Sequence, residues 1–332
     1  MDVAARAGVS FKTVSRVVNN EAHVRPALRE KVLKAVDELG YRPNLAARQL
    51  AGNRTFLISL ILADVTNSYS SRVVMAAAAE CRRFGYHLVS EIVPEGETGE
   101  EVVRRVLANS RPDGIIVSAP MCNEQRIVSA IEASGTPLVR MAGVGDAYGD
   151  AITVHERDVA ARLVRHLIEY GHRRIGLIAP PDRHRASHER VLGYRDALES
   201  AGISYDPGLV LTGDFSFASG ATIAETMLSW EDRPTAIFAS NDGMALGVLA
   251  QAGKMGLHVP RDVAVAGFDD SPGSRMVFPP LTTVRQPIQA MARAAVLTLL
   301  GEEIPNEPFE HELILRGSTT GDRELVLTTR DA

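Results

Sequence analysis

The sequence predicts an α/β protein with a small helical head and a larger body built on parallel sheets. Two observations support this. Short helical patterns with start and stop signals fill residues 2–40, and strand-like apolar runs alternate with amphipathic helical patterns over the rest of the chain. The chain has 332 residues, 45% of them hydrophobic and 23% charged, so it can bury large cores and divide into about two or three domains.

Three short helices are expected in the head. Residues 2–7 form the first, Gly8 suits the turn, Ser10 can cap the second, and the third begins at Pro26 and ends before Gly40. Apolar positions for a shared core are Val3, Ala4, Ala7, Val14, Val17, Val18, Val32, Leu33, Val36 and Leu39. Two short helices joined by a tight turn, with a third behind them, are typical of a helix-turn-helix unit.

The second helix of the head turns a mixed set of side chains outward. These are Phe11, Lys12, Thr13, Ser15 and Arg16. Hydrogen-bond donors combined with a ring and a methyl group suit base edges in a DNA major groove. The head is therefore predicted to bind DNA through this helix.

Charge is distributed unevenly along the chain. Residues 1–54 hold 10 Lys and Arg against 5 Asp and Glu, whereas the remaining residues hold 26 against 36. A basic head on an acidic body favours a polyanionic partner, although a solvated basic surface would explain the charge alone equally well.

The body is predicted to contain two parallel sheets, because its apolar runs are more numerous than the strands that one sheet usually holds. The expected strands are 57–63, 86–92, 113–118, 136–142, 151–154, 174–179, 208–213, 234–239 and 262–267. Ligands of such sheets bind beyond the C-terminal ends of the strands, so the residues that follow each strand are the candidates for a binding site.

Five side chains in the loops and helix starts that follow strands suit a hydroxylated ligand: Tyr69, Arg190, Phe215, Asn241 and Asp269. Amide, carboxylate and guanidinium groups bind neighbouring hydroxyls, and an aromatic ring stacks on the apolar face of a pyranose. Asn and Asp after strands also cap the next helix, and a purely structural role is the alternative for Asp269, Asp242 and Tyr69.

Signals for an enzyme, a metal site or export are weak. Gly143, Gly145 and Gly149 read GxGxxxG, but "AITV" after them is strand-like, so the segment is interpreted as a loop; GxxxxGK[ST], HExxH and GxSxG do not occur. His184 and His188 are four residues apart without a third ligand and are interpreted as a surface pair. Because a signal peptide and a membrane-length apolar run are also lacking, we expect a cytoplasmic protein that is not an enzyme and needs no cofactor, metal or membrane.

Cys81 and Cys122 are far apart without a CxxC spacing, which predicts no disulfide framework.

Besides a DNA-binding protein and an enzyme, the third class of protein that the body could indicate is an exported solute-binding protein. It would explain the body, but it would need a signal peptide and has no use for the basic head.

Several of these stretches together resemble the lactose-repressor (LacI/GalR) family of bacterial transcription factors. They are "DVAARAGVSFKTVSRVVNN", "VRPALREKVLKAVDELGYRPNLAARQLAG", "SNDGMALG" and "GFDDS", and the similarity covers essentially the whole chain. It implies two Rossmann-like lobes of periplasmic-binding-protein type, three chain crossings between them, and an effector cleft between the lobes. Members usually carry a few more residues before helix 1, so either the chain starts upstream of Met1 or Asp2 caps that helix.

The resemblance implies a head of residues 1–43, a hinge helix of residues 44–53 and a body of residues 54–332. One lobe would comprise about 54–155 with 284–314, the other 156–283 with 315–332. The hinge would order in the minor groove of operator DNA. The DNA-binding residues expected on pattern and resemblance together are Ser10, Phe11, Lys12, Thr13, Ser15, Arg16, Asn19, His23, Asn44, Ala47 and Leu50.

In the body, the resemblance implies that Arg190, Asn241 and Asp269 hydrogen-bond the effector and that Phe215 covers it. Ser68 stands where many members carry proline, which weakens the assignment of Tyr69. The loop "RMAGVGDAYGD" lacks the Asp-Arg pair often found there, so no residue is assigned from it.

The expected function is that of a dimeric repressor that a sugar or small glycoside releases from palindromic double-stranded operator DNA. The end "LVLTTRDA" carries no leucine heptads, which favours a homodimer over a tetramer. Two alternatives remain: a corepressor-type regulator with a purine-like effector, and a solute-binding protein without a DNA role.

Overall fold

The computed structural model describes residues 2–18, 24–41, 54–63, 67–94, 96–143, 145–181, 184, 187–305 and 309–321. The chain forms two compact units, Met1–Phe56 and Leu57–Ala332, which are the head and the body. Within the described residues, no helix combines the length and the apolar character needed to cross a bilayer.

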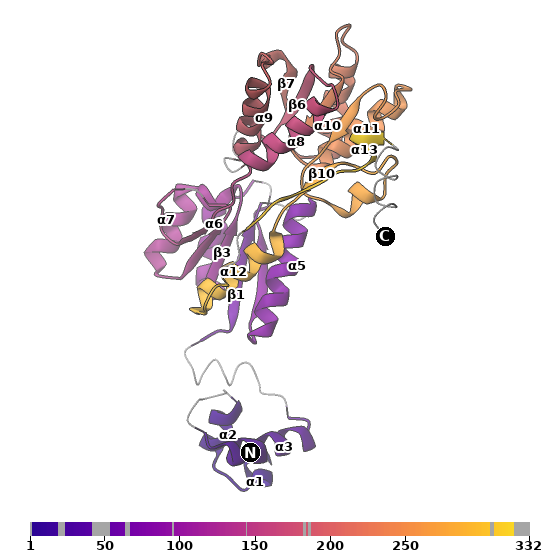
Figure 1. Cartoon of the computed structure of the whole chain (residues 1–332). Helices are drawn as coiled ribbons and strands as arrows, with labels where there is room; N and C mark the ends of the chain where they lie inside the picture. The colour runs from indigo at the N-terminus through magenta and orange to yellow at the C-terminus, as the bar shows by residue number, and fades with distance from the viewer. Residues whose placement is uncertain are drawn as a thin grey trace, which may run out of the picture. The chain divides into compact units, whose positions relative to one another are not determined.

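The head consists of three helices (Figure 1), α1 (Asp2–Ala7), α2 (Phe11–Val18) and α3 (Pro26–Glu38). Gly8 takes a φ of +62° between the first two helices, a conformation that costs glycine little. Ser10 caps α2, because its Oγ accepts a hydrogen bond from the Thr13 amide at 3.2 Å. The three predicted helices are confirmed.

One detail of the predicted head core is wrong. Leu33 and Leu39 are each 45% exposed, and the buried residues of α3 are Val32 and Ala35, with Val36 packed beside them. Leu33 follows Val32 directly, so it projects about 100° away from the stripe that faces α1 and α2. Leu39 lies beyond Val36, the last residue of α3 that packs against the head core.

The body contains two parallel sheets, with strand orders β2-β1-β3-β4-β5 and β7-β6-β8-β9. The strands of the first sheet are β1 (Leu57–Leu62), β2 (His87–Ile92), β3 (Gly114–Ser118), β4 (Leu138–Met141) and β5 (Asp150–Ile152). Those of the second are β6 (Ile175–Ala179), β7 (Val210–Thr212), β8 (Ala236–Ala239) and β9 (Ala264–Ala266). All nine predicted strands are found.

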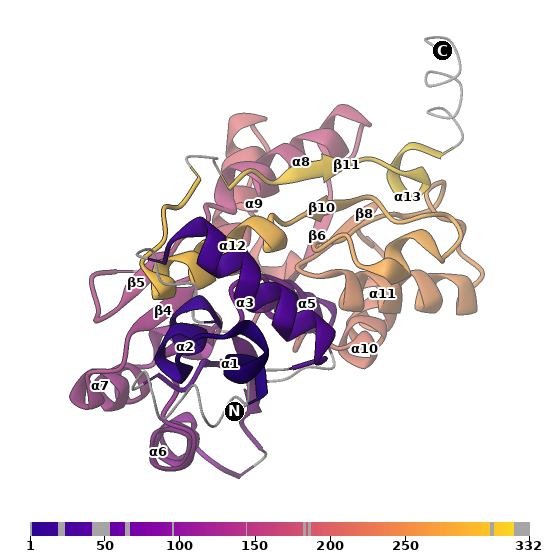
Figure 2. The same cartoon turned by 90° about the horizontal axis from the view of Figure 1, so that it is seen from below.

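Helices cover both faces of the first sheet (Figure 2). The helix pair α5 (Ser68–Arg83) and α12 (Ile288–Leu300) packs together on one face, and α6 (Gly99–Asn109) and α7 (Gln125–Ser134) lie on the other. A short helix, η1 (Met121–Asn123), precedes α7. Parallel strands buried on both faces read as continuous apolar runs, which is why "LISLIL" and "GIIVS" were clear signals.

The second sheet is covered in the same way. On one face lie α8 (Arg157–Glu169) and α9 (His188–Ser200), and on the other α10 (Phe217–Leu228) and α11 (Asp242–Lys254). Within β6, Leu177 joins the α8–α9 core whereas Ile178 joins the α10–α11 core. The remaining helices are η3 (Pro207–Leu209), η4 (Pro272–Arg275) and α13 (Gly317–Thr320).

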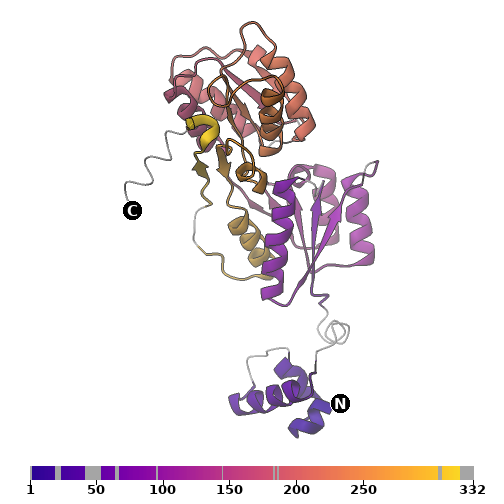
Figure 3. The same ribbon diagram turned by 90° about the vertical axis from the view of Figure 1, so that its right-hand side faces the viewer.

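Two further strands link the lobes: β10 (Thr283–Arg285) and β11 (Glu312–Ile314), an antiparallel pair beside the second sheet. A bridge between Asp269 and Arg285 ties β10 to the segment after β9. The chain therefore passes between the lobes after β5, after β10 and again after α12 (Figure 3).

Candidate functional site

A cavity of about 570 Å³ lies in the body, where loops that follow strands of both sheets meet. The five side chains predicted for a ligand site all line it: Tyr69, Arg190, Phe215, Asn241 and Asp269. They come from five different loops or helix starts of both lobes, so the positions that follow strands bring together residues far apart in sequence.

Arg190 is held by a buried ion pair with Glu156. Its Nε lies 2.7 Å and its Nη2 3.0 Å from the two carboxylate oxygens of Glu156, and both side chains are 5% exposed. Nη1 donates to the main-chain oxygen of Ser240, and the guanidinium lies 3.8 Å from the centre of the Phe268 ring. Arg190 is thus fixed in place at the cavity wall.

Asp269 stands at the end of β9 with a φ of +120°. Its amide donates to the oxygen of Val284 at 2.8 Å, its own oxygen accepts from Arg72 at 2.5 Å, and its Oδ1 accepts from Gln286 at 2.6 Å. Burial raises the pKa of Asp269 to about 7, against the opposing effect of the Arg190 charge. Asp269 therefore titrates near neutral pH.

Asn241 caps α11 and also anchors Phe215. Its Oδ1 accepts from the Met244 amide at 2.9 Å, and its Nδ2 donates to the Phe215 oxygen at 3.0 Å. Phe215 has a φ of +70°, and its ring meets that of His184 edge to face at 4.7 Å between centres. The capping role considered for residues after strands is therefore present at Asn241, together with a position on the cavity wall.

Tyr69 lines the cavity from the first lobe, at the start of α5. The helix is capped by Asn67, whose Oδ1 accepts from the Ser70 amide at 2.8 Å. Burial raises the pKa of Tyr69, and the Glu156 carboxylate raises it further, so the phenol stays protonated.

Glu156, His184 and Gln286 also line the cavity but were not among the predicted site residues. Glu156 lies in the segment between β5 and α8, so a search of the residues that follow each strand would have included it. Gln286 follows β10, which was not predicted. His184, interpreted as part of a surface pair with His188, is half-buried, and its ring also packs against Phe215.

One expectation about a loop holds for the described residues. The glycine-rich segment is a loop followed by β5, as predicted. The described part of the chain holds no group of three or more His, Cys, Asp or Glu side chains placed to bind a metal.

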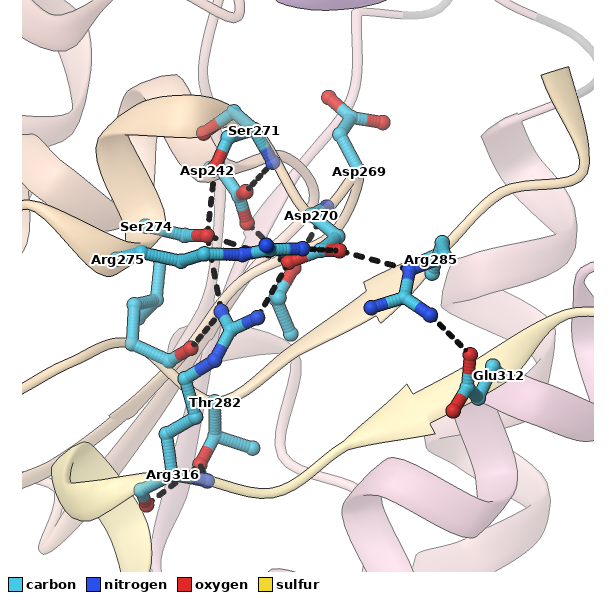
Figure 4. Close-up of polar contacts among 12 residues, drawn as sticks. Asp242, Asp269, Asp270, Ser271, Ser274, Arg275, Thr282, Arg285, Glu312 and Arg316 are labelled. Atoms are coloured by element: carbon cyan, nitrogen blue, oxygen red, sulfur yellow. Dashed lines mark hydrogen bonds and ion pairs between the residues drawn. The ribbon is translucent and has the colours of Figure 1, made fainter. Parts of the chain in front are cut away.

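Next to the cavity, Asp270 forms the centre of an arginine cluster (Figure 4). Its Oδ2 lies 2.8 Å from both Arg275 and Arg285, and its Oδ1 lies 2.5 Å from Arg316. These bonds hold the pKa of Asp270 below its ordinary value although burial opposes them. Beside it, the buried Asp242 accepts from the Ser271 amide and from Thr283, and burial raises its pKa to about 6.

In the head, the outward face of α2 carries the predicted DNA-binding side chains. Phe11 is 68% exposed, Lys12 and Arg16 are exposed, and Thr13 and Ser15 are half-buried. The exposed Ser10 precedes them as the cap of α2. The other expected DNA-binding residues lie outside the described residues: Asn19, His23, Asn44, Ala47 and Leu50.

Comparison with known proteins supports both parts of the chain. A family model described as "Bacterial regulatory proteins, lacI family" matches residues 1–44, and one described as "Periplasmic binding protein-like domain" matches residues 164–319. The HTH-type transcriptional repressor PurR of Vibrio vulnificus is 34% identical over 300 residues, 90% of each chain.

Two solved structures are similar over nearly the whole length. One is the lac repressor dimer bound to operator and the anti-inducer ONPF, with 32% identity, a TM-score of 0.77, and 96% of this chain and 98% of that chain covered. The other is the transcriptional regulator CelR–cellobiose complex, with 32% identity, a TM-score of 0.69 and the same coverage.

A helix-turn-helix head joined to a two-lobed, ligand-binding body defines a class of bacterial transcription regulators. The chain belongs to the LacI family within that class. It is a DNA-binding transcriptional repressor with an effector-binding body, and its relatives are repressors and not enzymes.

Proposed function

We propose that the protein is a homodimeric repressor that leaves a palindromic operator when a sugar or small glycoside enters the cavity of the body. The observation that carries the proposal is the composition of that cavity. Carboxylate, guanidinium and amide groups from Asp269, Arg190 and Asn241 stand beside the ring of Phe215, which suits a ligand with hydroxyl edges and an apolar face. The complex of a similar regulator with cellobiose supports the same class of ligand.

On the DNA side, we propose that Lys12 and Arg16 contact the operator from α2, together with the other outward residues of that helix. Their exposure on one face of a helix that is capped and packed on its other face supports this role. Residues 44–53 would form the hinge helix, with Asn44 as its cap, Ala47 on its close-packed face and Leu50 as the wedge in the minor groove.

The homodimer is supported by apolar side chains that the body leaves in solvent. Met75 on α5 is 72% exposed, and Met276 and Phe278, just after η4, are 82% and 96% exposed. Arg72 of α5 contacts the segment that precedes η4, so these side chains come from neighbouring parts of the surface. Exposed apolar groups of this size favour a protein interface.

A purine-like corepressor is the second candidate, because the aromatic side chains of Tyr69, Phe215 and Phe217 line the cavity and could hold a flat base. PurR repressors are among the similar proteins. In that mechanism the effector would tighten operator binding, not weaken it.

Calorimetry and gel-shift titration with the full chain separate the two candidates. Glucose, galactose, cellobiose, hypoxanthine and guanine are the probes, each with and without operator DNA obtained by in vitro selection. Under induction, a sugar weakens operator binding, and operator weakens sugar binding by the same factor, because linkage is reciprocal. A base that tightens operator binding would replace this proposal with the corepressor mechanism.

Arg190→Ala adds a test of the cavity itself. The variant should still occupy the operator but no longer leave it when the sugar is added, because the head is untouched while the ligand loses a buried partner. Release of the variant at the parent's sugar concentration would contradict the role of Arg190.

A further inference from the structure

The Glu156–Arg190 pair sets the charge that the cavity accepts. We infer that the cavity admits an uncharged, hydroxylated effector and rejects its phosphorylated or carboxylated counterparts, and that Glu156 is the residue that enforces this choice. The inference rests on the proposed function in that it concerns the ligand of the same cavity.

The first argument is that Arg190 is already neutralised. A guanidinium has five N–H groups. Nε and Nη2 each donate to a different oxygen of Glu156, at 2.7 and 3.0 Å, and Nη1 donates to the oxygen of Ser240. The positive charge that an incoming phosphate or carboxylate would seek is therefore already offset by a bidentate, buried carboxylate.

The second argument is the sign of the other charges on the wall. Within the described residues, Arg190 is the one lysine or arginine that lines the cavity, whereas the carboxylates of Glu156, Asp214 and Asp269 all line it. Glu156 is buried, so water screens its charge poorly, and the buried Asp269, with a pKa of about 7, adds negative charge in its ionised form. Among the described lining residues, an anionic ligand would therefore meet like charge and no further lysine or arginine to offset it.

The third argument is that the same groups serve a neutral polyol well. Arg190 has one N–H on each of Nη1 and Nη2 beyond the bonds described above, and the carboxylate oxygens can accept from hydroxyls. The edge-to-face pair of His184 and Phe215 offers an apolar contact for the C–H groups of a sugar ring. A hydroxyl both donates and accepts hydrogen bonds, so it can pair with the N–H groups of Arg190 and with the carboxylate oxygens alike.

The decisive experiment is calorimetric titration of inorganic phosphate into the full chain, its Glu156→Gln variant, and a control, Glu169→Gln, at the exposed end of α8, the helix that Glu156 precedes. The parent and the control should show no saturable binding at millimolar phosphate. Glu156→Gln should gain it, since Arg190 is then left without its counter-charge, and adding Arg190→Met should remove it again.

Two results would overturn the inference. One is phosphate binding by the parent that Arg190→Met abolishes, and the other is a folded Glu156→Gln variant that gains no phosphate binding. Glu156→Asp, which keeps the charge but shortens the side chain, should still reject phosphate. If Glu156→Gln does not fold, as judged by circular dichroism, the parent and Glu156→Asp decide the question alone.

A second measurement compares glucose with glucose 6-phosphate and glucuronate on the parent. The neutral sugar should bind at least about tenfold more tightly than either anion, a difference of about 1.4 kcal/mol. Tighter binding of an anionic sugar would contradict the inference and leave the sugar-induced repressor intact. If no sugar of either kind changed operator binding, the proposed function would fail, while the phosphate titrations would still decide the role of Glu156.

Discussion

Arg72 on α5 donates from Nη1 to the main-chain oxygen of Asp269 at the end of β9, over 2.5 Å. The same nitrogen lies 3.4 Å from the oxygen of Asp270. Asp269 and Asp270 have φ values of +120° and +49°, in a region that side chains other than glycine rarely adopt. A side chain of the first lobe therefore helps to hold a strained segment of the second lobe, and that segment carries a cavity residue.

Replacing this arginine should loosen the segment without unfolding the body. In Arg72→Ala, the amides of Asp269 and Asp270 should exchange with solvent faster than in the parent, because the carbonyl groups around them lose a charged donor. Arg72→Lys should lie between the two. Hydrogen exchange followed by mass spectrometry measures this, and Arg83→Ala is the control, since Arg83 lies on the same helix and pairs only with Glu80 among the contacts described. Equal exchange in the parent and Arg72→Ala would show that the contact is not stabilising.

Asp270 should be among the most costly carboxylates to remove. Its carboxylate is 2% exposed and lies among Arg275, Arg285 and Arg316, so Asp270→Ala would remove the carboxylate that these three arginines share and leave Arg285 with Glu312 as its acidic partner. We expect a loss of about 3–5 kcal/mol in the free energy of unfolding, measured by urea denaturation. The control, Asp232→Ala, removes an exposed partner of Arg174 and should cost less than about 1 kcal/mol.

The sign of the pH effect at Asp270 follows from its lowered pKa. The stabilisation is fully present above the unfolded pKa of about 4 and is lost as pH falls through the lower folded value. The difference between the parent and Asp270→Ala should therefore be constant from pH 6 to 8 and shrink only in strong acid. A difference that shrinks on the alkaline side would contradict this assignment.

Most of the body could be predicted from sequence because the central strands of its sheets, such as β1, β3, β6 and β8, are buried on both faces. Runs such as "GIIVS" are continuous and apolar, and each is followed by a helical pattern. By contrast, β10 and β11 have three residues each, and they are recognisable only through their pairing with one another. Such a pairing over nearly 30 residues leaves no local periodicity to detect.

The positions of the cavity residues could be predicted from the sequence, but their ion-pair partners could not. The residues that follow strands were identified correctly as lining one cavity, since the topology of parallel sheets gathers them. The pairing of Arg190 with Glu156 was missed, because it joins residues 34 apart in the chain and neither has a distinctive neighbourhood. The exposure of Leu33 was missed for the opposite reason: its apolar character suggested burial, but helix geometry placed it off the packed face.

Asp269 should make the stability of the body depend on pH. Its folded pKa of about 7 lies above the unfolded value of about 4, so ionising it costs the folded state more than the unfolded state. The contribution of Asp269 is therefore most favourable below pH 4 and declines as pH rises toward 7. Asp269→Asn, whose Oδ1 can still accept from Gln286, should remove that decline.

Urea denaturation at pH 5 and pH 8 tests this assignment. Asp269→Asn should stabilise the protein relative to the parent more at pH 8 than at pH 5, by on the order of 1–3 kcal/mol. Asp196→Asn is the control, because Asp196 is bonded to Arg157 and its pKa is lowered, so its effect should not change between these pH values. The same gain for Asp269→Asn at both pH values would mean that Asp269 is already charged at pH 5.

Phe11 should read a thymine methyl group in the operator. It is the first residue of α2 and is 68% exposed, although every other apolar residue of α2 is buried or half-buried. In the major groove, the 5-methyl group of thymine is the one apolar feature that a base pair presents, and phenylalanine is a suitable partner for it. If α2 enters the major groove as proposed, the exposed ring of Phe11 would lie close to the base edges.

Replacing thymine by deoxyuridine removes this methyl group and keeps every hydrogen bond of the base pair. With operator selected in vitro by the full chain, we expect at least one thymine in each half-site whose replacement weakens binding several-fold in a gel-shift titration. Phe11→Ala should bind the unmodified operator more weakly and should no longer distinguish the two bases. Lys12→Ala, the matched neighbour, should lose affinity through its lost charge but keep its sensitivity to the methyl group. If the parent tolerates deoxyuridine at every position, or if Phe11→Ala retains the discrimination, the methyl group is not read by Phe11.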